Sequence, residues 1–134
     1  MSVAGRSSQF IQPRDLRLGT PIQQLFDLSG RTALATGGSR GLGLQIAESL
    51  GEAGAKILLS SRKAADLEEA AAHLQDKGID TRWIAADASE PAEVHRVVGE
   101  AMERLGAIDI LVNNAGATWG APMAEHPLEA WDKV

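Results

Sequence analysis

The clearest candidates for chemistry lie in a glycine-rich segment, Thr36–Gly43, which reads T-G-G-S-R-G-L-G. Without a Cβ, Gly37 can make a tight turn, Gly41 lets the backbone approach a ligand, and Gly43 lets a following helix pack closely. Free N–H groups at the start of such a helix bind anions. We therefore predict a phosphate-binding turn whose contacts come from Gly37, Ser39, Arg40, Gly41, Leu42 and Gly43.

The spacing of these glycines separates the segment from two other phosphate-binding motifs. It is not G-x-G-x-x-G, and no Gly-Lys-Ser/Thr follows as in a P-loop. A plain turn without a ligand is the alternative for any short glycine-rich stretch. The position between an apolar run and an amphipathic segment favours the ligand.

A second signal is the pattern of charge at Ser60–Arg62, directly after another apolar run. A site that accepts NAD usually places Asp or Glu here, on the ribose 2′-hydroxyl. A carboxylate would repel a 2′-phosphate, whereas Arg62 can form charge-assisted bonds to it and Ser61 can add a hydroxyl. Together with Arg40, this pattern favours NADP(H) as the cofactor. The alternative is that both arginines are ordinary solvated surface charges.

The elements that would position these residues follow from hydrophobic periodicity. Short apolar runs alternate with amphipathic segments, which predicts helices between buried parallel strands. The predicted fold class is α/β: a Rossmann-type doubly wound parallel sheet, incomplete, with the first four strands and three to four helices. Ligands bind such a sheet beyond the carboxyl ends of its strands. We expect strands at residues 32–36, 57–59, 83–86 and 108–112. The apolar helix positions are Leu42, Ile46, Ala47 and Leu50, then Leu67, Ala71 and Leu74, then Val94, Val97, Val98, Ala101 and Leu105, with Ser89 as the cap of the third helix.

Composition restricts the classes of function. A chain of 134 residues with 44% hydrophobic content can bury one core. A net charge of −5 with scattered basic residues argues against nucleic acid as a partner. The absence of cysteine removes thiolate metal sites and cysteine nucleophiles. The spacing of His73, His95 and His126 indicates no metal site.

Residues 1–27 are expected to form an N-terminal arm, and residues 28–134 the NADP-binding Rossmann half. The arm holds no apolar run of the kind that secretion or a membrane span requires, so we expect a cytoplasmic protein with no membrane partner. An organelle transit peptide is the alternative for this Arg- and Ser-containing start. Pro13, Asp15 and Pro21 would interrupt its basic amphipathic helix.

Two spaced motifs together resemble the short-chain dehydrogenase/reductase family, classical type. They are T-G-x-x-x-G-x-G at Thr36–Gly43 and N-N-A-G at Asn113–Gly116. The resemblance covers the chain from about Leu28 to Val134. It implies a Rossmann fold that binds NAD(H) or NADP(H), and the part present is the cofactor-binding half.

The resemblance also implies roles for residues at the ends of the later strands. Asp87 and Ala88 would contact the adenine, although an Asp in an ordinary turn is the alternative. Ala115 and Gly116 would pass under the cofactor's ribose. Asn113 would tie neighbouring strands together through its side-chain amide. All five are therefore candidate cofactor-site residues.

The family's catalytic groups are an Asn, a Ser and a Tyr-x-x-x-Lys pair, and this sequence contains no tyrosine. Trp131–Val134 resembles the beginning of the helix that delivers the catalytic Asn, so the chain is expected to stop before the catalytic segment. We assign no catalytic and no metal-binding residue. Trp119 either contacts the substrate or packs against its own loop.

The function that the resemblance implies belongs to an intact parent protein. That parent would be an NADPH-dependent ketoreductase or alcohol dehydrogenase that reduces a carbonyl by hydride transfer. Its substrate would be a 3-oxoacyl thioester or a keto-sugar acid, since the chain looks most like 3-oxoacyl reductases and gluconate 5-dehydrogenase-like members. The family implies a homo-oligomer. The alternative is a non-catalytic NADP(H)-binding or interaction module from a truncated gene.

Overall fold

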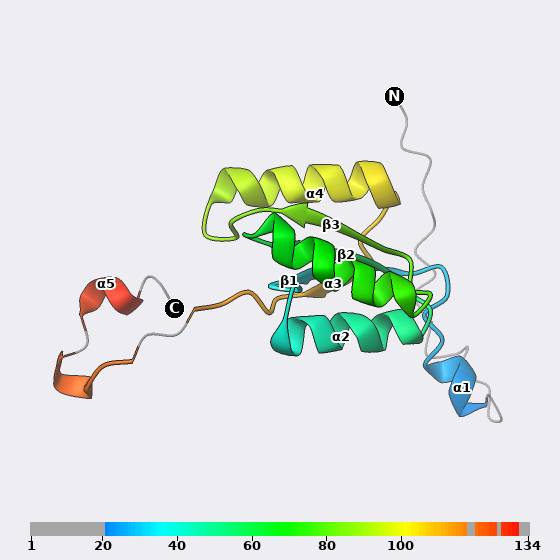
Figure 1. Ribbon diagram of the computed structural model, residues 1–134, viewed down its shortest axis with the longest axis horizontal. Coiled ribbons are helices and arrows are strands. Elements are labelled where there is room, and N and C mark those ends of the chain that lie inside the picture. Colours follow the sequence, from blue (N-terminus) through cyan, green and yellow to red (C-terminus); the bar gives the residue numbers. More distant parts are fainter. Residues whose placement is uncertain (1–20, 118–119, 126, 132–134) are drawn as a thin grey trace, which may run out of the picture.

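The computed structural model describes residues 21–117, 120–125 and 127–131, and most of the expected N-terminal arm lies outside these ranges. Strands and helices alternate through the centre of the chain (Figure 1). The elements are α1 (Ile22–Leu25), β1 (Thr32–Thr36), α2 (Gly41–Glu52), β2 (Lys56–Ser61), α3 (Ala64–Asp76), β3 (Thr81–Ala85), α4 (Pro91–Leu105), β4 (Ile110–Val112), the 3-10 helix η1 (Met123–Glu125) and α5 (Leu128–Trp131).

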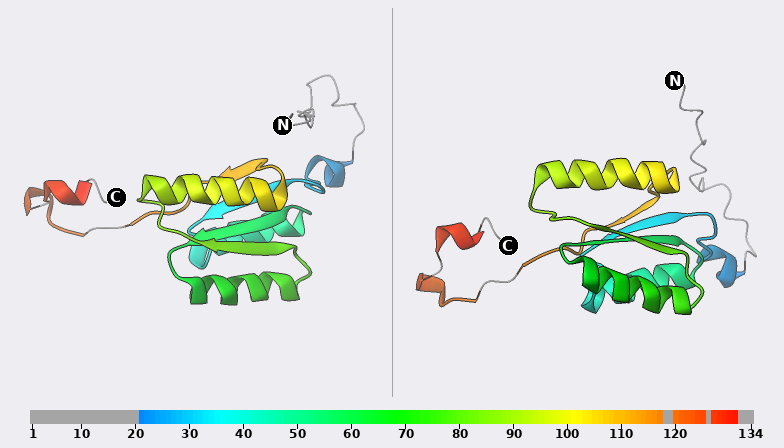
Figure 2. Two further views of the ribbon diagram at one scale, coloured as in Figure 1. Left: turned by 90° about the horizontal axis from the view of Figure 1, so that it is seen from above. Right: turned by 45° about the horizontal axis from the view of Figure 1, so that its top comes forward.

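The four strands form one parallel sheet in the order β3-β2-β1-β4. Helices α2 and α3 lie on one face of the sheet and α4 on the other, as the two views of Figure 2 show. A parallel sheet needs such helical crossovers, and they cover both of its faces. The prediction of an incomplete doubly wound sheet is confirmed.

Each face of the sheet buries its own cluster of apolar side chains. On the α2 and α3 face the largest fully buried residues are Ile57, Leu59, Leu67 and Leu74. The α4 face has a smaller cluster, composed of Leu34, Leu58, Ile84, Ala86, Val97 and Ala101. The strands are apolar on both sides for this reason, which is why they appear in the sequence as continuous apolar runs.

The face that α2 turns to the sheet differs from the prediction. Leu42 and Ile46 are 71% and 37% exposed, whereas Gly43 and Ala47 are buried. Small side chains face the sheet because α2 lies close to it. The prediction was therefore wrong for Leu42 and Ile46 but right for Ala47, which is buried, and for Leu50, which is partly buried and packs against the core.

Several predicted boundaries also change. Helix α4 has Glu90 as its N-cap residue with Pro91 at its first position, so Ser89 does not cap it. The Ser89 hydroxyl donates instead to Asp87 Oδ1 at 2.7 Å. Strand β3 begins at Thr81 rather than at residue 83, because its first two residues are polar and gave no apolar signal. Strand β4 begins at Ile110 rather than at residue 108.

Candidate functional site

All four strands are parallel, so the turns that follow their carboxyl ends lie at the same end of the sheet. Ligands of doubly wound folds bind at that end. Every residue that the sequence assigned to the cofactor lies at the end of a strand, in the turn that follows it or in the first turn of α2. The structure therefore gathers these candidates at one end of the sheet.

The glycine turn after β1 depends on the absence of side chains. Gly37 and Gly41 have φ values of +62° and +57°, which other residues rarely adopt. A Cβ on Gly37 would lie 2.8 Å from Asn114 Nδ2, and one on Gly43 would collide with the carbonyl oxygen of Gly37. By contrast, a Cβ on Gly41 would meet nothing within 4 Å. The surface at Gly41 is thus open toward solvent, as a ligand would require.

Asn114 holds this turn against β4. Its Nδ2 donates to the carbonyl oxygens of Thr36 and Gly37, each at 3.1 Å. The Thr36 hydroxyl donates to the carbonyl of Val112 at 3.0 Å and accepts from the Asn114 N–H at 3.1 Å. The expectation that Asn113 ties the strands was wrong, because its neighbour makes these bonds and Asn113 is exposed.

The alternation of side chains along β4 could have identified Asn114 from the sequence. Side chains alternate between the two faces of a strand. Ile110 and Val112 pack against the cluster on the α2 face, so Asn114, two residues further on, continues toward the helix that follows the glycine turn. The side chain of Asn113 follows the same face of the strand as that of Leu111, which is 55% exposed.

The glycine turn is also tied to the end of β2. The Ser39 hydroxyl lies 3.2 Å from the Ser61 hydroxyl, and the Gly38 N–H donates to the Ser60 carbonyl at 3.2 Å. These bonds fix the first turn beside the segment where the sequence placed the ribose-binding residues. Ser61 is half-buried, whereas the next residue, Arg62, is exposed.

Two cations stand at the ends of neighbouring strands. Arg40 is the N-cap residue of α2, and its side chain is exposed. It lines a cavity of about 490 Å³ between the glycine turn and α3, together with Asp66, Glu69 and His73. Arg62 follows β2. Both cations are open to solvent beside the glycine turn.

Asp87 follows β3 and is half-buried. The backbone N–H and the hydroxyl of Ser89 donate to its Oδ1 at 3.0 and 2.7 Å. These two bonds, with a smaller contribution from the charge of Arg62, hold the pKa of Asp87 below its usual value. No hydrogen bond within the described residues uses Asp87 Oδ2, which leaves this oxygen available to a donor.

The remaining candidates lie at the surface of the same end. Ala88, Asn113, Ala115 and Gly116 are exposed, and the Ala115 N–H donates to the Thr36 hydroxyl at 3.1 Å. Trp119 and His126 lie outside the described residues. Within the described ranges there is no cluster of His, Asp and Glu that could hold a metal ion. Nor is any helix in those ranges long and apolar enough to cross a membrane.

Comparison with known families agrees with this arrangement. The family model described as short chain dehydrogenase matches residues 31–134. This chain belongs to the short-chain dehydrogenase family. The family explains why the glycine turn and the Asn113–Gly116 segment occur together at the carboxyl ends of β1 and β4.

Two curated members of the family show how much of it the chain contains. A rhamnolipids biosynthesis 3-oxoacyl-(acyl-carrier-protein) reductase of Pseudomonas aeruginosa is 44% identical over 109 residues, which are 81% of this chain and 42% of that protein. Gluconate 5-dehydrogenase of Gluconobacter oxydans is 38% identical over 110 residues, covering 82% and 43% respectively. The chain thus spans less than half the length of either relative.

Solved members of the family share the fold. The L-sorbose reductase of Gluconobacter frateurii, determined with NADPH and L-sorbose, superposes with a TM-score of 0.75 at 39% identity, covering 80% of this chain and 41% of that one. Two further solved relatives are complexes with NADP. The solved short-chain dehydrogenases that are similar to this chain therefore include enzymes crystallised with the phosphorylated cofactor.

Proposed function

We propose that this chain binds NADP(H) at the carboxyl ends of its strands and discriminates against NAD(H). The observation that carries the proposal is the pair of exposed cations, Arg40 within the glycine turn and Arg62 directly after β2. No carboxylate occupies the end of β2, where an NAD site would place one. Solved relatives with NADP(H) support the assignment.

Each part of the site has a separate task in this proposal. The free N–H groups at the start of α2 and the open surface at Gly41 receive the pyrophosphate. Arg62, Ser61 and Arg40 hold the 2′-phosphate through charge-assisted bonds. Oδ2 of Asp87 accepts from the adenine amino group. Ser89 keeps this carboxylate ionised and oriented through its two bonds to Oδ1.

The reaction that we propose for the intact protein is the reduction of a carbonyl to an alcohol, with the nicotinamide supplying hydride. Its substrate would be a 3-oxoacyl thioester or a keto-sugar acid, and the names of the relatives support both classes. The protein would act in the cytoplasm as a homo-oligomer on a small molecule. The 134-residue chain contributes the cofactor site to this reaction.

A second candidate is a module that binds NADP(H) without turnover. It is favoured by the absence of tyrosine, because the family's proton donor is a tyrosine. The two candidates separate in an assay of NADPH oxidation by the complete product of the gene, with a 3-oxoacyl thioester or a keto-sugar acid. Binding without turnover by that product supports the module, whereas turnover supports the carbonyl reductase.

The test of the cofactor site is a titration of NADPH and NADH into the 134-residue chain, followed calorimetrically. We expect NADPH to bind at least about tenfold more tightly, because one charge-assisted bond contributes roughly 1.5 to 3 kcal/mol before desolvation. Arg62→Ala should remove most of that preference. Arg82→Ala removes an exposed arginine from β3 and should leave it intact. Equal affinities in the unmodified chain would refute the proposal.

A further inference from the structure

The outer edge of the sheet at β3 has a specific hydrogen-bonding pattern. Among the residues that the structure describes, strand β3 pairs with β2 alone, and its other side borders no strand. The Ile57 N–H donates to the Asp80 carbonyl at 2.8 Å, and the Ala86 N–H donates to the Ser61 carbonyl at 2.9 Å. Because partners alternate along a strand, the odd-numbered residues of β3 direct their N–H and C=O groups outward. Such an edge can pair with a strand from another chain.

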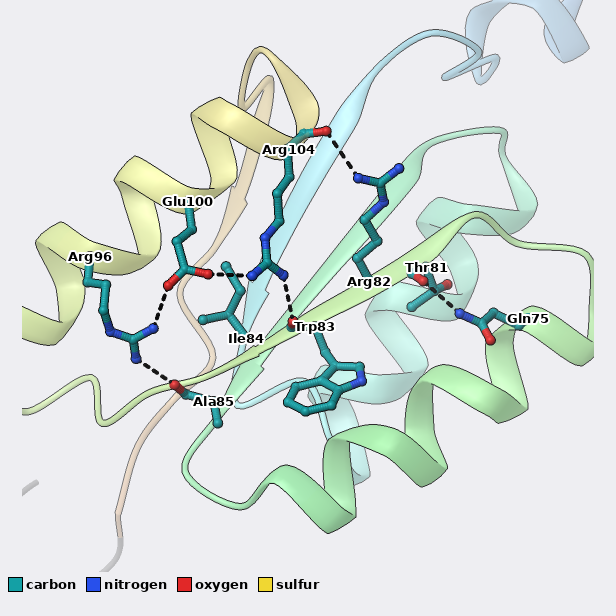
Figure 3. Close-up of a pocket in the computed structure, with 9 residues that line it drawn as sticks. All are labelled: Gln75, Thr81, Arg82, Trp83, Ile84, Ala85, Arg96, Glu100 and Arg104. Atoms are coloured by element: carbon teal, nitrogen blue, oxygen red, sulfur yellow. Dashed lines mark hydrogen bonds and ion pairs between the residues drawn. The ribbon is translucent and has the colours of Figure 1, made fainter.

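Each outward carbonyl of β3 already accepts a hydrogen bond from a side chain. The donors come from α3 on one side of the strand and α4 on the other, as Figure 3 shows. They line a groove of about 740 Å³ along the strand. The bonds run from Gln75 Nε2 to the Thr81 carbonyl (2.8 Å), from Arg104 Nη1 to the Trp83 carbonyl (3.3 Å) and from Arg96 Nη2 to the Ala85 carbonyl (2.7 Å).

The two arginines are held in place by carboxylates on their own helix. Arg96 lies between Glu93 and Glu100, at 2.6 and 2.7 Å, and Arg104 pairs with the other oxygen of Glu100 at 2.6 Å. A guanidinium has five donors in a planar fork, so it can bond a carboxylate and a backbone carbonyl together. The carboxylates therefore orient the guanidinium groups toward the strand.

We propose that Gln75, Arg96 and Arg104 form an edge cap that keeps β3 from pairing with a strand of a second copy of this chain. An added strand needs the carbonyls of residues 81, 83 and 85 for its ladder. To reach them it must displace donors from both flanking helices and break the ion pairs of Glu100. A purely structural role, in which the same bonds only attach α4 to the sheet, would affect stability but not self-association.

The experiment compares two triple variants of the 134-residue chain. The uncapped variant carries Gln75→Ala, Arg96→Ala and Arg104→Ala. The control variant carries Gln45→Ala, Lys63→Ala and Lys77→Ala, which remove one glutamine and two cations from exposed helix positions and ends and leave the three carbonyls capped. Both variants lower the net charge equally from the −5 of the unmodified chain, so electrostatic repulsion opposes association to the same extent.

Sedimentation velocity measures self-association, and amide hydrogen exchange by NMR locates it. We expect the uncapped variant to associate at least about tenfold more tightly than the control, the change expected from one net hydrogen bond. The amides of Thr81, Trp83 and Ala85 should become protected as its concentration rises. The amide of Leu111, on β4, points away from β1, so it reports pairing at the other edge and should behave alike in both variants.

Equal association of the two triple variants, or protection that grows at Leu111 and not on β3, would overturn the proposal. If the uncapped variant does not fold, Arg96→Lys with Arg104→Lys replaces it. Lysine keeps the charge but cannot bond the carboxylate and the carbonyl as a fork. This variant should associate more than the unmodified chain, with protection on β3, and no change in either measurement would count against an edge cap.

Discussion

Hydrogen bonds join β1 to β4 at both ends of this strand pair, but different side chains make them at each end. At the amino end, Asp109 Oδ2 accepts from the Thr32 N–H at 2.9 Å, while the Thr32 hydroxyl donates to the Ala107 carbonyl at 2.6 Å. At the carboxyl end, the Asn114 amide donates to the carbonyls of Thr36 and of the following residue. A threonine of β1 and a side chain near β4 therefore join the strands at both ends.

The difference between these joints lies in what each one holds. A carboxylate only accepts, so Asp109 binds N–H and hydroxyl groups of β1 and the guanidinium of Arg31. An amide can donate twice, so Asn114 reaches one carbonyl in β1 and a second one, that of Gly37, in the glycine turn. Only the carboxyl-end joint fixes the turn that we assign to the cofactor.

The largest effect is expected where the carboxyl-end joint is most crowded. Gly43→Val places a branched side chain against the Gly37 carbonyl and Asn114, so α2 must move away from the turn. We expect NADPH binding to be abolished and the melting temperature to fall. Gly99→Val, in α4, is the matched control because a Cβ there meets nothing within 4 Å. Normal folding and NADPH binding by the Gly43 variant would show that the phosphate turn is misplaced.

Removing each joint should separate stability from binding. Asn114→Ala leaves two backbone carbonyls without their donor, and Asp109→Ala leaves the Thr32 N–H without its acceptor. We expect each to cost about 2 kcal/mol in the free energy of unfolding, measured with urea. NADPH affinity should fall in the Asn114 variant alone. A similar loss of affinity in both would mean that the two joints act through general stability.

A smaller effect, dependent on pH, should mark the amino-end joint. Burial tends to raise the pKa of Asp109, but the bonds from Thr32 and Arg31 outweigh it, so the pKa lies below the usual 3.8. A pKa lowered on folding contributes stability that is complete above the unfolded value and is lost as the pH falls through the folded one.

The stability difference between the unmodified chain and Asp109→Asn should therefore stay constant from about pH 7 to 5 and shrink below about pH 4. Thermal melts across this range measure it, with Asp80→Asn as an exposed control carboxylate. If the stability difference is unchanged at low pH, the ionised carboxylate of Asp109 does not stabilise this joint.

Much of the fold could be predicted because buried parallel strands are apolar throughout. The strand at Thr32–Thr36 was predicted with its correct bounds. The start of β3 was missed because Thr81 and Arg82 are polar, although they pair with β2. Periodicity also placed Leu42 on the buried face of α2, because spacing alone does not show how close a helix lies to a sheet.

The glycine turn could be predicted because its glycines are a local signal, and two of them have positive φ values. The cofactor contacts of Arg40 and Arg62 stay predictions. The prediction named Asn113 where Asn114 makes the bonds, because it did not take into account which face of β4 meets α2. The bonds from Gln75 and Arg104 to β3 could not be predicted, because long flexible side chains make them and no sequence spacing specifies which backbone carbonyl such a side chain reaches.

In the function that we propose, this chain recognises the 2′-phosphate of NADP(H). The most direct measurement is the affinity of the chain for 2′,5′-ADP and for 5′-AMP, which differ by that phosphate alone, in the unmodified chain and in Arg62→Asp. We predict that 2′,5′-ADP binds at least about tenfold more tightly to the unmodified chain and that the substitution abolishes or reverses this preference. Equal affinities in the unmodified chain, or a preference that survives Arg62→Asp, would contradict it.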